Sequence, residues 1–464
     1  MTHLQWGGRF GAAPDPALLA FGSSLEDDLV LAPFDVQTSQ AHVDALAGGG
    51  IIDPAAAAAL HGALDGVAAE IENGSFDAYA RASGAEDVHG AIDARVRELR
   101  PQAGALLHAG RSRNDQVATT LALYAHDRAR AGARRTQSIA RHLLARAVEE
   151  LNAQTLLAAT THMQPAQPVL LAFWLQTAAE PFVRDAKRFA RVADSALHSC
   201  PLGSGAVSGS TLPLDREAAC RRLGFERPSR NAMDAIGTRE SALDVAHACA
   251  LALVNASRVS AEIVVWAMPA FGYVRLGDAS STGSSLMPQK RNPDVFELVR
   301  GSASEITGAY FGALASTIGL PLSYHRDLQE TKRLTIAVCE RALAALDAFE
   351  RALRDTNFVR ANLNARAGEG YTVATDIADA LIQSGTSARD AHAFVGAAVR
   401  AAEEAGRALD ERDLDALARE AGLKNLHAPL TPQASVAAKM TSGSTSPGAV
   451  RAGLASLAAE LDQI

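Results

Sequence analysis

Residues 114–151 read NDQVATTLALYAHDRARAGARRTQSIARHLLARAVEEL, a stretch without proline and with a single glycine, Gly132. Alanine, leucine, arginine and glutamate dominate it, and all four are strong helix formers. The stretch therefore predicts one long helix. Residues 238–268 contain neither glycine nor proline. Their apolar side chains recur at spacings of three and four, which predicts a second helix about 45 Å long with one apolar face.

Three further stretches predict long helices, and no valine-rich alternating stretch bounded by hairpin turns is present. These stretches are 169–199, bent near Pro181, then 295–317 and 328–355. The predicted fold class is therefore all-α. Helices of this length cannot bury their faces inside a small globule, so we expect them to form a bundle. Apolar surface left outside would be covered by copies of the same chain, which predicts a homo-oligomer.

The long-helix block sets the predicted domain boundaries near Arg111 and Ala365. We expect an N-terminal helical domain over 1–111, a central long-helix domain over 112–364 and a small C-terminal helical domain over 365–464. A chain of 464 residues with 48% apolar composition has ample material for such cores.

Charge and cysteine content exclude several classes of protein. The formal net charge is −8, and basic residues are interspersed with acidic ones, which disfavours nucleic acid and anionic membranes as partners. No secretory signal is visible, and no apolar run approaches the roughly 20 residues of a membrane span, so we expect a soluble protein. The four cysteines are far apart, which favours free thiols in the cytoplasm. No histidine spacing typical of a metal site occurs, and none is predicted.

Four polar segments join the predicted helices and suggest one composite site. They are HAGRSRND (108–115), TTHMQPAQP (160–168), PLGSGAVSGS (201–210) and GDASSTGSSLMPQKRNPD (277–294). In the last segment a serine hydroxyl could move a proton if positive charge and amide donors lower its pKa. Lys290 and Asn292 could hold a carboxylate that gains charge when its α-carbon is deprotonated. This equipment suits carbanion chemistry beside a carboxylate.

Three of these segments also have a simpler interpretation. The serine-rich segment could be a flexible connection capped by Asn292. His162 could be a structural histidine, and Glu297, which could orient an imidazole, could be an ordinary acidic residue in the first turn of a helix. RSRND could be a turn in which Asn114 or Asp115 caps the next helix, with arginines that also meet a dianionic substrate.

Taken together, the motifs resemble the argininosuccinate lyase branch of the aspartase/fumarase superfamily. The resemblance runs almost end to end. It rests on WGGRF (6–10), the segment from Phe21 to Asp28, EDVH (86–89), LHAGRSRNDQVAT (107–119), THMQPAQP (161–168), PLGSGAVSG (201–209), GSSLMPQKRNP (283–293), PLSYHRDLQETK (321–332) and YTVATDIADAL (371–381).

The resemblance implies three helical domains and a homotetramer in which the long helices form a twenty-helix core, with active sites shared between subunits. The implied reaction is the reversible β-elimination of argininosuccinate to fumarate and arginine, a step of arginine biosynthesis, without a cofactor. The implied catalytic residues are Ser284, His162, Glu297 and Lys290. Ser284 is favoured as the base, with the choice between Ser284 and His162 left open. The implied substrate-binding residues are Ser24, Arg113, Asn114, Thr161, Asn292, Tyr324, Gln329 and Lys332.

Several positions depart from the usual motifs, and these departures leave two alternatives open. They are Gly90, Ala91, Ala109, Thr120, Pro165, Thr238, Glu240, His325 and Arg326. If they shape the pocket of the leaving group, the chain could be a paralogous carbon–nitrogen lyase that acts on another N-substituted aspartate. A catalytically inactive structural homologue is the second alternative, and the retained Ser284, His162, Lys290 and Glu297 argue against it.

Overall fold

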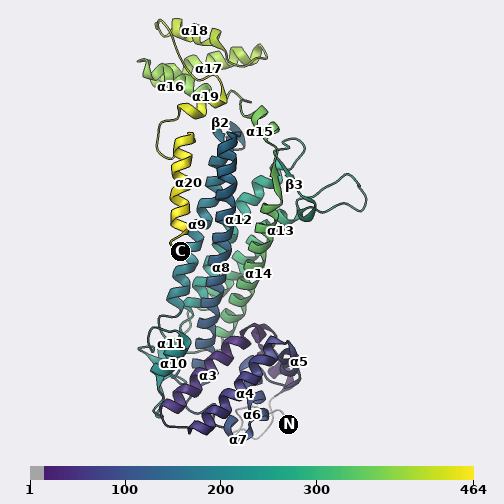
Figure 1. Ribbon diagram of the computed structural model, residues 1–464, viewed down its shortest axis with the longest axis vertical. Helices are drawn as coiled ribbons and strands as arrows, with labels where there is room; N and C mark the ends of the chain where they lie inside the picture. Colours follow the sequence, from purple (N-terminus) through teal and green to yellow (C-terminus); the bar gives the residue numbers. More distant parts are fainter. Residues whose placement is uncertain (1–14) are drawn as a thin grey trace. The chain divides into compact units, whose positions relative to one another are not determined.

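The computed structural model describes residues 15–464 and is built almost entirely of helices (Figure 1). The predicted all-α class is confirmed. The five long helices are α8 (Arg113–Ala153), α9 (Leu171–Ala196), α12 (Glu240–Trp266), α13 (Asp294–Ala315) and α14 (Leu328–Arg354). All five were predicted from sequence to within a few residues at each end.

Shorter elements make up the rest of the described chain. Before α8 come α1 (Pro16–Gly22), α2 (Leu25–Asp28), the 3₁₀ helix η1 (Leu29–Leu31), α3 (Ala32–Gly48), α4 (Pro54–Glu72), α5 (Ser75–Ala82), α6 (Val88–Leu99) and α7 (Pro101–Gly104). Between the long helices lie β1 (Leu156–Thr161), β2 (Gln164–Leu170), α10 (Arg216–Leu223), α11 (Ala232–Gly237), β3 (Val274–Leu276) and η2 (Asp278–Ser280). After α14 come β4 (Thr356–Phe358), α15 (Arg360–Arg366), α16 (Ala374–Gln383), α17 (Ala388–Glu404), α18 (Glu411–Glu420), α19 (Pro432–Ala438) and α20 (Pro447–Leu461).

The chain forms two compact units. Among the described residues, the first comprises 15–134, 187–254 and 302–345, and the second comprises 135–186, 255–301 and 346–464. Each boundary between these segments falls inside one of the five long helices. The division into three domains over 1–111, 112–364 and 365–464 stays a prediction, and the WGGRF motif at 6–10 lies outside the described residues.

In the first unit, α3 packs against α4 and α10 around small apolar side chains. Ala41 and Ala45 of α3 share a buried cluster with Cys200, Leu202 and Cys220. All four cysteines are free and buried, in agreement with the expectation of free thiols.

In the second unit, two short antiparallel sheets of two strands each interrupt the helical pattern. Strands β1 and β2 pair with each other, and β3 pairs with β4. The predicted helix over 169–199 therefore starts late, at Leu171, because Val169 and Leu170 pair with Leu157 and Leu156. The helix continues through Pro181.

The helix α12 corrects one expectation. Its 27 residues are long and apolar enough to cross a membrane by length and composition, so the prediction that no run reaches that length was wrong. Half of its most apolar 18-residue window is buried inside the protein, as in the core helix of a globular fold.

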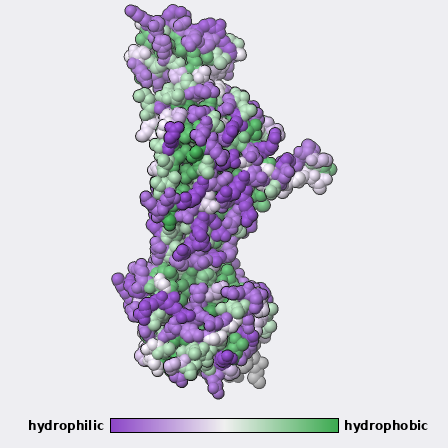
Figure 2. All heavy atoms as spheres, in the orientation of Figure 1, coloured by the Kyte–Doolittle hydropathy of each residue, from purple (hydrophilic) through white to green (hydrophobic). Residues whose placement is uncertain are grey.

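The face drawn in Figure 2 is mostly hydrophilic, with apolar side chains gathered in patches among the polar ones. Large apolar side chains are also exposed along α13, where Leu298 is 64% and Phe311 60% exposed, and Leu314 is exposed as well. Side chains of this kind are usually covered when a long helix belongs to a bundle.

Gly132 in the middle of α8 provides a test of this packing. A Cβ atom at Gly132 would lie 2.6 Å from the ring of the buried Phe189. We therefore expect Gly132→Ala to lower the free energy of unfolding by about 1–3 kcal/mol, although alanine is the better helix former. The matched control is Gly62→Ala on α4, where a Cβ would meet nothing within 4 Å, and we expect it to stabilise by about 0.5–1 kcal/mol. Urea unfolding measures both, and equal effects of the two substitutions would contradict this account.

Candidate active site

The N-terminus of α8 is closed by Ser112 and Asp115. The Ser112 hydroxyl accepts a hydrogen bond from the Asn114 N–H (3.2 Å), and one oxygen of Asp115 accepts from the Ser112 N–H (3.0 Å). This reciprocal arrangement resembles a capping box. The predicted caps, Asn114 and Asp115, were wrong because the helix already begins at Arg113, which makes Ser112 the cap.

Asp115 also holds the glycine-rich loop that follows α9. Its second oxygen accepts hydrogen bonds from the N–H groups of Gly203 (3.0 Å) and Gly205 (2.8 Å). Burial raises the pKa of Asp115 to about 6, and these backbone donors oppose that rise. Asn114 adds a further contact, because its side-chain amide donates to the carbonyl of Ala206 (3.0 Å). Two of the four predicted polar segments therefore lie against each other.

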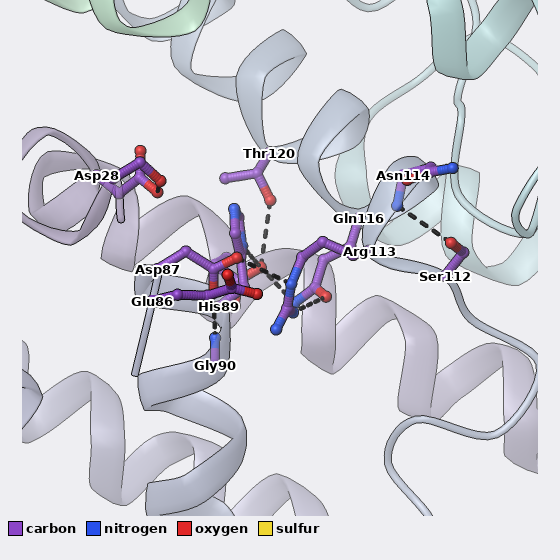
Figure 3. A network of polar contacts seen from close by, with 12 residues as sticks. Asp28, Glu86, Asp87, His89, Gly90, Ser112, Arg113, Asn114, Gln116 and Thr120 are labelled. Carbon is purple, nitrogen blue, oxygen red and sulfur yellow. Dashed lines mark hydrogen bonds and ion pairs between the residues drawn. The ribbon is translucent and has the colours of Figure 1, made fainter. Parts of the chain in front are cut away.

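Arg113 lies in the first turn of α8, where Asp87 and Gln116 hold its guanidinium (Figure 3). Its Nε pairs with Asp87 Oδ2 at 3.0 Å, and its Nη1 donates to Gln116 Oε1 at 2.7 Å. Asp87 is itself the N-cap of α6 and accepts from the Gly90 N–H at 2.6 Å. The guanidinium of Arg113 is thus fixed by two elements of the first unit.

Behind Arg113, Asp35 anchors a buried network. Gln116 donates to Asp35 Oδ1 (2.8 Å), and so do His89 through Nδ1 (2.8 Å) and Thr120 through its hydroxyl (3.3 Å). Burial alone would raise the pKa of Asp35, but His89 and other donors lower it to about 2. Asp35 is therefore a carboxylate at neutral pH. A carboxylate can only accept hydrogen bonds, so the NH₂ group of Gln116 faces Asp35. The amide oxygen of Gln116 therefore faces Arg113.

A second buried group joins Ser24, Asp28 and Lys332. The ammonium of Lys332 lies 2.6 Å from Asp28 Oδ1 and donates to the Ser24 hydroxyl at 3.2 Å. Ser24 in turn donates to Asp28 Oδ2 at 2.6 Å. The side chains of Lys332 and Asp28 are 5% and 0% exposed, so this ion pair is almost completely removed from water.

These groups surround a cavity of about 60 Å³ that lies within the first unit. It is lined by Ser24, Glu86, Asp87, Arg113, Val117, Arg239, Tyr324, Arg326, Leu328, Gln329 and Lys332. Five of the predicted substrate-binding residues are in this wall. Arg111 is not, because its buried guanidinium donates to the Ser39 hydroxyl at 2.9 Å.

Arg239 is a wall residue that the sequence analysis missed. Its Nη1 donates to the carbonyls of Ile236 (3.0 Å) and Thr238 (2.6 Å), whereas Nε and Nη2 are buried without a partner among the described residues. Burial lowers the pKa of Arg239 to about 10, so it stays charged at neutral pH. The only sequence signal was its place beside Thr238 in the GTRE stretch, and an isolated arginine carries little information.

Another part of the wall comes from the first turn of α14 and the segment just before it. Gln329 and Arg326 both donate to the carbonyl of Gly22, at 3.2 and 2.6 Å. Burial raises the pKa of Tyr324, and the neighbouring Arg239 opposes the rise. Tyr324 therefore stays a neutral phenol near neutral pH.

His162 lies in the tight turn of the hairpin formed by β1 and β2. Thr161 ends β1 and pairs with Gln164 of β2, so His162 and Met163 form a two-residue turn. Their φ angles are 53° and 62°, as in the type I′ turns of tight hairpins, which usually employ asparagine or glycine. The imidazole is exposed at the tip of this hairpin in the second unit.

The serine-rich segment forms an ordered turn. Ser284 Oγ accepts hydrogen bonds from the N–H groups of Leu286 (3.2 Å) and Met287 (3.0 Å). Lys290 donates to the side-chain oxygen of Asn292. Asn292 pairs with Thr282 through two backbone hydrogen bonds and does not cap α13, which begins at Asp294.

Glu297 occupies the first turn of α13, where the helix dipole favours an acid. It lies 3.9 Å from Arg300, and no hydrogen bond or ion pair joins it to His162 within residues 15–464. The predicted residues thus fall into two groups. Ser24, Arg113, Asn114, Tyr324, Gln329 and Lys332 belong to the first unit, and Thr161, His162, Ser284, Lys290, Asn292 and Glu297 belong to the second.

Most departures from the usual motifs lie outside the cavity wall. Thr120 is buried and bonded to Asp35 and Thr38, and His325 has a buried Nε2 without a partner in the described chain. Arg326 is the one departure that lines the cavity of the first unit. Among residues 15–464 no group of three or more histidine, cysteine or acidic side chains could hold a metal ion.

Comparison with known proteins identifies the family. Residues 8–308 match the family described as "Lyase", and residues 371–437 match "Argininosuccinate lyase C-terminal". The argininosuccinate lyase of Nitratidesulfovibrio vulgaris is 40% identical over 463 residues, which cover 99% of each chain. The chain belongs to the argininosuccinate lyase family. A second argininosuccinate lyase, from Anaeromyxobacter sp., is 44% identical over 85% of this chain and 83% of its own.

Solved structures agree on the fold. An EDDS lyase in complex with formate superposes with a TM-score of 0.81 at 23% identity, covering 97% of this chain and 91% of its own. The fumarate lyase from Mesorhizobium sp. gives 0.69 at 19% identity over 98% of each chain. As a member of the argininosuccinate lyase family, the chain is a carbon–nitrogen lyase that acts on a small molecule.

The buried pair of Asp28 and Lys332 generates a stability prediction. Replacing one member leaves the other charge buried without a partner, so we expect Lys332→Met to lower the free energy of unfolding by about 3–5 kcal/mol. The double variant Lys332→Met, Asp28→Leu removes both charges and should recover most of that loss. Urea unfolding measures the difference, and a double variant that is less stable than Lys332→Met would contradict the prediction.

Proposed function

We propose that this chain catalyses the reversible β-elimination of argininosuccinate to fumarate and arginine. A proton leaves the carbon next to one carboxylate of the succinyl half, and the C–N bond on the neighbouring carbon breaks. The electron pair of the C–H bond becomes the double bond of fumarate, and the departing nitrogen takes up a proton. The cavity that supports this proposal is lined by four cationic side chains and by neutral hydrogen-bonding ones. Its acidic wall residues, Glu86 and Asp87, pair with Arg326 and Arg113.

Ser284 is proposed to act as the base. The two amide donors on its oxygen would stabilise the alkoxide, which lowers the cost of removing its proton. Lys290 and Asn292, joined by a hydrogen bond, are proposed to stabilise the carboxylate that gains charge as the carbanion forms. Asn292 keeps its side-chain amide on the same short turn as Ser284.

His162 and Glu297 are proposed as the second acid/base pair, with Thr161 beside them on the substrate. The exposure of the imidazole at the tip of the hairpin supports this role, because another subunit or the substrate can reach it there. The contact between the imidazole and Glu297 would be made in the assembled oligomer, where the carboxylate would raise the basicity of the ring.

The substrate-binding roles follow from the cavity. Ser24, Lys332, Gln329 and Tyr324 are proposed to contact the substrate through their polar ends, and Asn114 through the first turn of α8. Arg113, fixed by Asp87 and Gln116, would bind one carboxylate.

Arg239 is proposed to receive the carboxylate of the amine half. Asp28 balances Lys332 and Asp87 balances Arg113, whereas two nitrogens of Arg239 have no partner in the described chain. A buried guanidinium without a partner favours an anionic ligand. The amine would therefore be an amino acid, as arginine is, which disfavours the paralogue that releases a different amine.

A homotetramer with sites shared between subunits is proposed as the active form. The exposed apolar side chains of α13, Leu298, Phe311 and Leu314, support a bundle between copies of the chain. We also propose a soluble cytoplasmic location, which suits buried free thiols. No observation favours the inactive structural homologue.

Arginine and agmatine, its decarboxylated analogue, test both the reaction and the role of Arg239. With fumarate in excess, we expect the protein to add arginine, with kcat/KM at least about tenfold above that for agmatine. Fumarate loss, followed by its ultraviolet absorbance, measures both rates. In the cleavage direction, purified protein should release fumarate from argininosuccinate.

In Arg239→Gln the preference for arginine over agmatine should fall at least about tenfold. The matched control is Arg333→Gln, an exposed arginine that pairs with Glu330, and it should keep the preference. If agmatine or another amine exceeded arginine by more than about tenfold with the wild type, the paralogue would replace the proposed function.

Ser284→Ala tests the proposed base. We expect turnover to fall by about 10²–10⁴, the usual contribution of a positioned acid or base, while folding is unchanged. Complementation tests the shared site, because an inactive His162→Asn chain and an inactive Ser284→Ala chain should regain activity when refolded together. Near-normal turnover of Ser284→Ala, or no recovery on mixing, would overturn the corresponding assignment.

A further inference from the structure

The segment that carries Ser284 starts at a small two-stranded sheet in the second unit. Strand β3 pairs with β4, with Leu276 opposite Thr356. The pairing extends by one hydrogen bond beyond the strands, from the Gly277 N–H to the carbonyl of Asp355 (2.8 Å). Asp355 is the residue between the end of α14 and the start of β4. The base of the segment is thus attached to the end of a long helix (Figure 1).

The carboxylate of Asp355 makes a second attachment. Its Oδ2 accepts from both the backbone N–H (3.0 Å) and the hydroxyl (2.7 Å) of Ser280. The approach is so close that a Cβ atom at Gly277 would lie 1.9 Å from Asp355 Oδ1. A glycine is therefore required at 277, and residues 277–280 wrap around this one side chain.

The returning arm of the segment is tied to the same base. Arg291 pairs with Asp278 at 2.6 Å and donates to the carbonyl of Leu276 at 3.1 Å. Thr282 and Asn292 exchange two backbone hydrogen bonds that close the turn between them. Residues 283–291 therefore project from a frame whose fixed point is Asp355.

We propose that Asp355 is a positioning residue that sets the direction in which Ser284 is presented to the substrate. It contacts neither Ser284 nor the residues proposed to bind substrate, and acts through Ser280 and Gly277. The inference rests on the proposed role of Ser284. Without the carboxylate, the first arm loses two of its attachments and Ser284 samples more orientations, which lowers the fraction of productive complexes.

Asp355→Ala tests the proposal in the full-length oligomer. We expect kcat to fall by about 10–100-fold with a much smaller change in KM, because the cavity that binds the amine is untouched. Asp355→Asn should recover most of the loss, since an amide oxygen can still accept from Ser280. The matched control is Arg354→Ala, which removes the neighbouring charge, paired with Glu350, and should leave kcat within about twofold.

A double-mutant cycle identifies the contact responsible. If Asp355 acts through Ser280, then Ser280→Ala should lower kcat in the same way, and the double variant should lose little more than Asp355→Ala alone. Independent, additive losses would overturn the proposal. So would a kcat of Asp355→Ala within about twofold of the wild type.

A measurement without turnover separates this proposal from the proposed function. Amide hydrogen exchange over 278–292 should accelerate in Asp355→Ala and Ser280→Ala and stay unchanged in Arg354→Ala. If the wild type failed to release fumarate while exchange followed this pattern, the reaction assignment would fail and the attachment would stand. Unchanged exchange would overturn the attachment, and if Asp355→Ala did not fold, Ser280→Ala and Asp355→Asn would carry the same comparison.

Discussion

One carboxylate, Asp115, fixes the part of the first unit from which Arg113 and Asn114 project. One of its oxygens closes the N-terminus of α8, and the other holds the backbone of Gly203 and Gly205. A helix of 41 residues thereby starts at a defined rotation, so that Arg113 and Asn114 leave its first turn in fixed directions. Arg113 meets Asp87, and Asn114 meets the loop after α9. The arrangement that caps the helix therefore also orients two residues that are proposed to bind substrate.

Two of the cations around the cavity are paired with a carboxylate of the described chain, and a third is not. Lys332 is neutralised by the buried Asp28, and Arg113 by Asp87. Arg239 is as deeply buried as Lys332 but has only carbonyl partners in the described chain. A buried guanidinium in this state is costly, and a substrate carboxylate would offset that cost on binding. The Arg239 guanidinium is thus a buried positive charge that no carboxylate of the described chain neutralises.

The sequence was informative where a local rule determines the structure. Helix propensity placed α8 and α12, because nothing in tertiary packing opposes a long stretch without proline. It was less informative at the start of α9, where β1 recruits Val169 and Leu170 into a hairpin by pairing that no local pattern encodes. The turn at His162 was missed for the same reason, since histidine and methionine are unusual at positive φ.

Tertiary contacts also decided which site residues could be found. Motif residues such as Lys332 and Ser24 were predicted because the family pattern marks them, and they do lie together. Arg239 and Asp355 carry no such mark. The first is notable only for the partners it lacks, and the second only because the chain returns from α14 to meet Gly277. Neither the missing partners of Arg239 nor the contact between Asp355 and Gly277 can be read from the residues next to them in the sequence.

The fold also shows where the departures from the family motifs lie. One hypothesis from the sequence is that departures such as Thr120, His325 and Arg326 shape the pocket of the leaving group. In the fold, Thr120 lies behind Gln116, where its hydroxyl donates to Asp35. A hydroxyl at this place leaves the buried network with one negative charge from Asp35, which His89 and Gln116 can satisfy, whereas a second carboxylate would need its own proton or cation. The change therefore alters the support of Arg113 and leaves the walls of the cavity as they are.

Of the departures from the family motifs, Arg326 alone lines the cavity, and its guanidinium donates to the carbonyl of Gly22. Under the proposed role of Arg239, specificity for the amine would depend mainly on that residue, and drift elsewhere would be compatible with the proposed reaction.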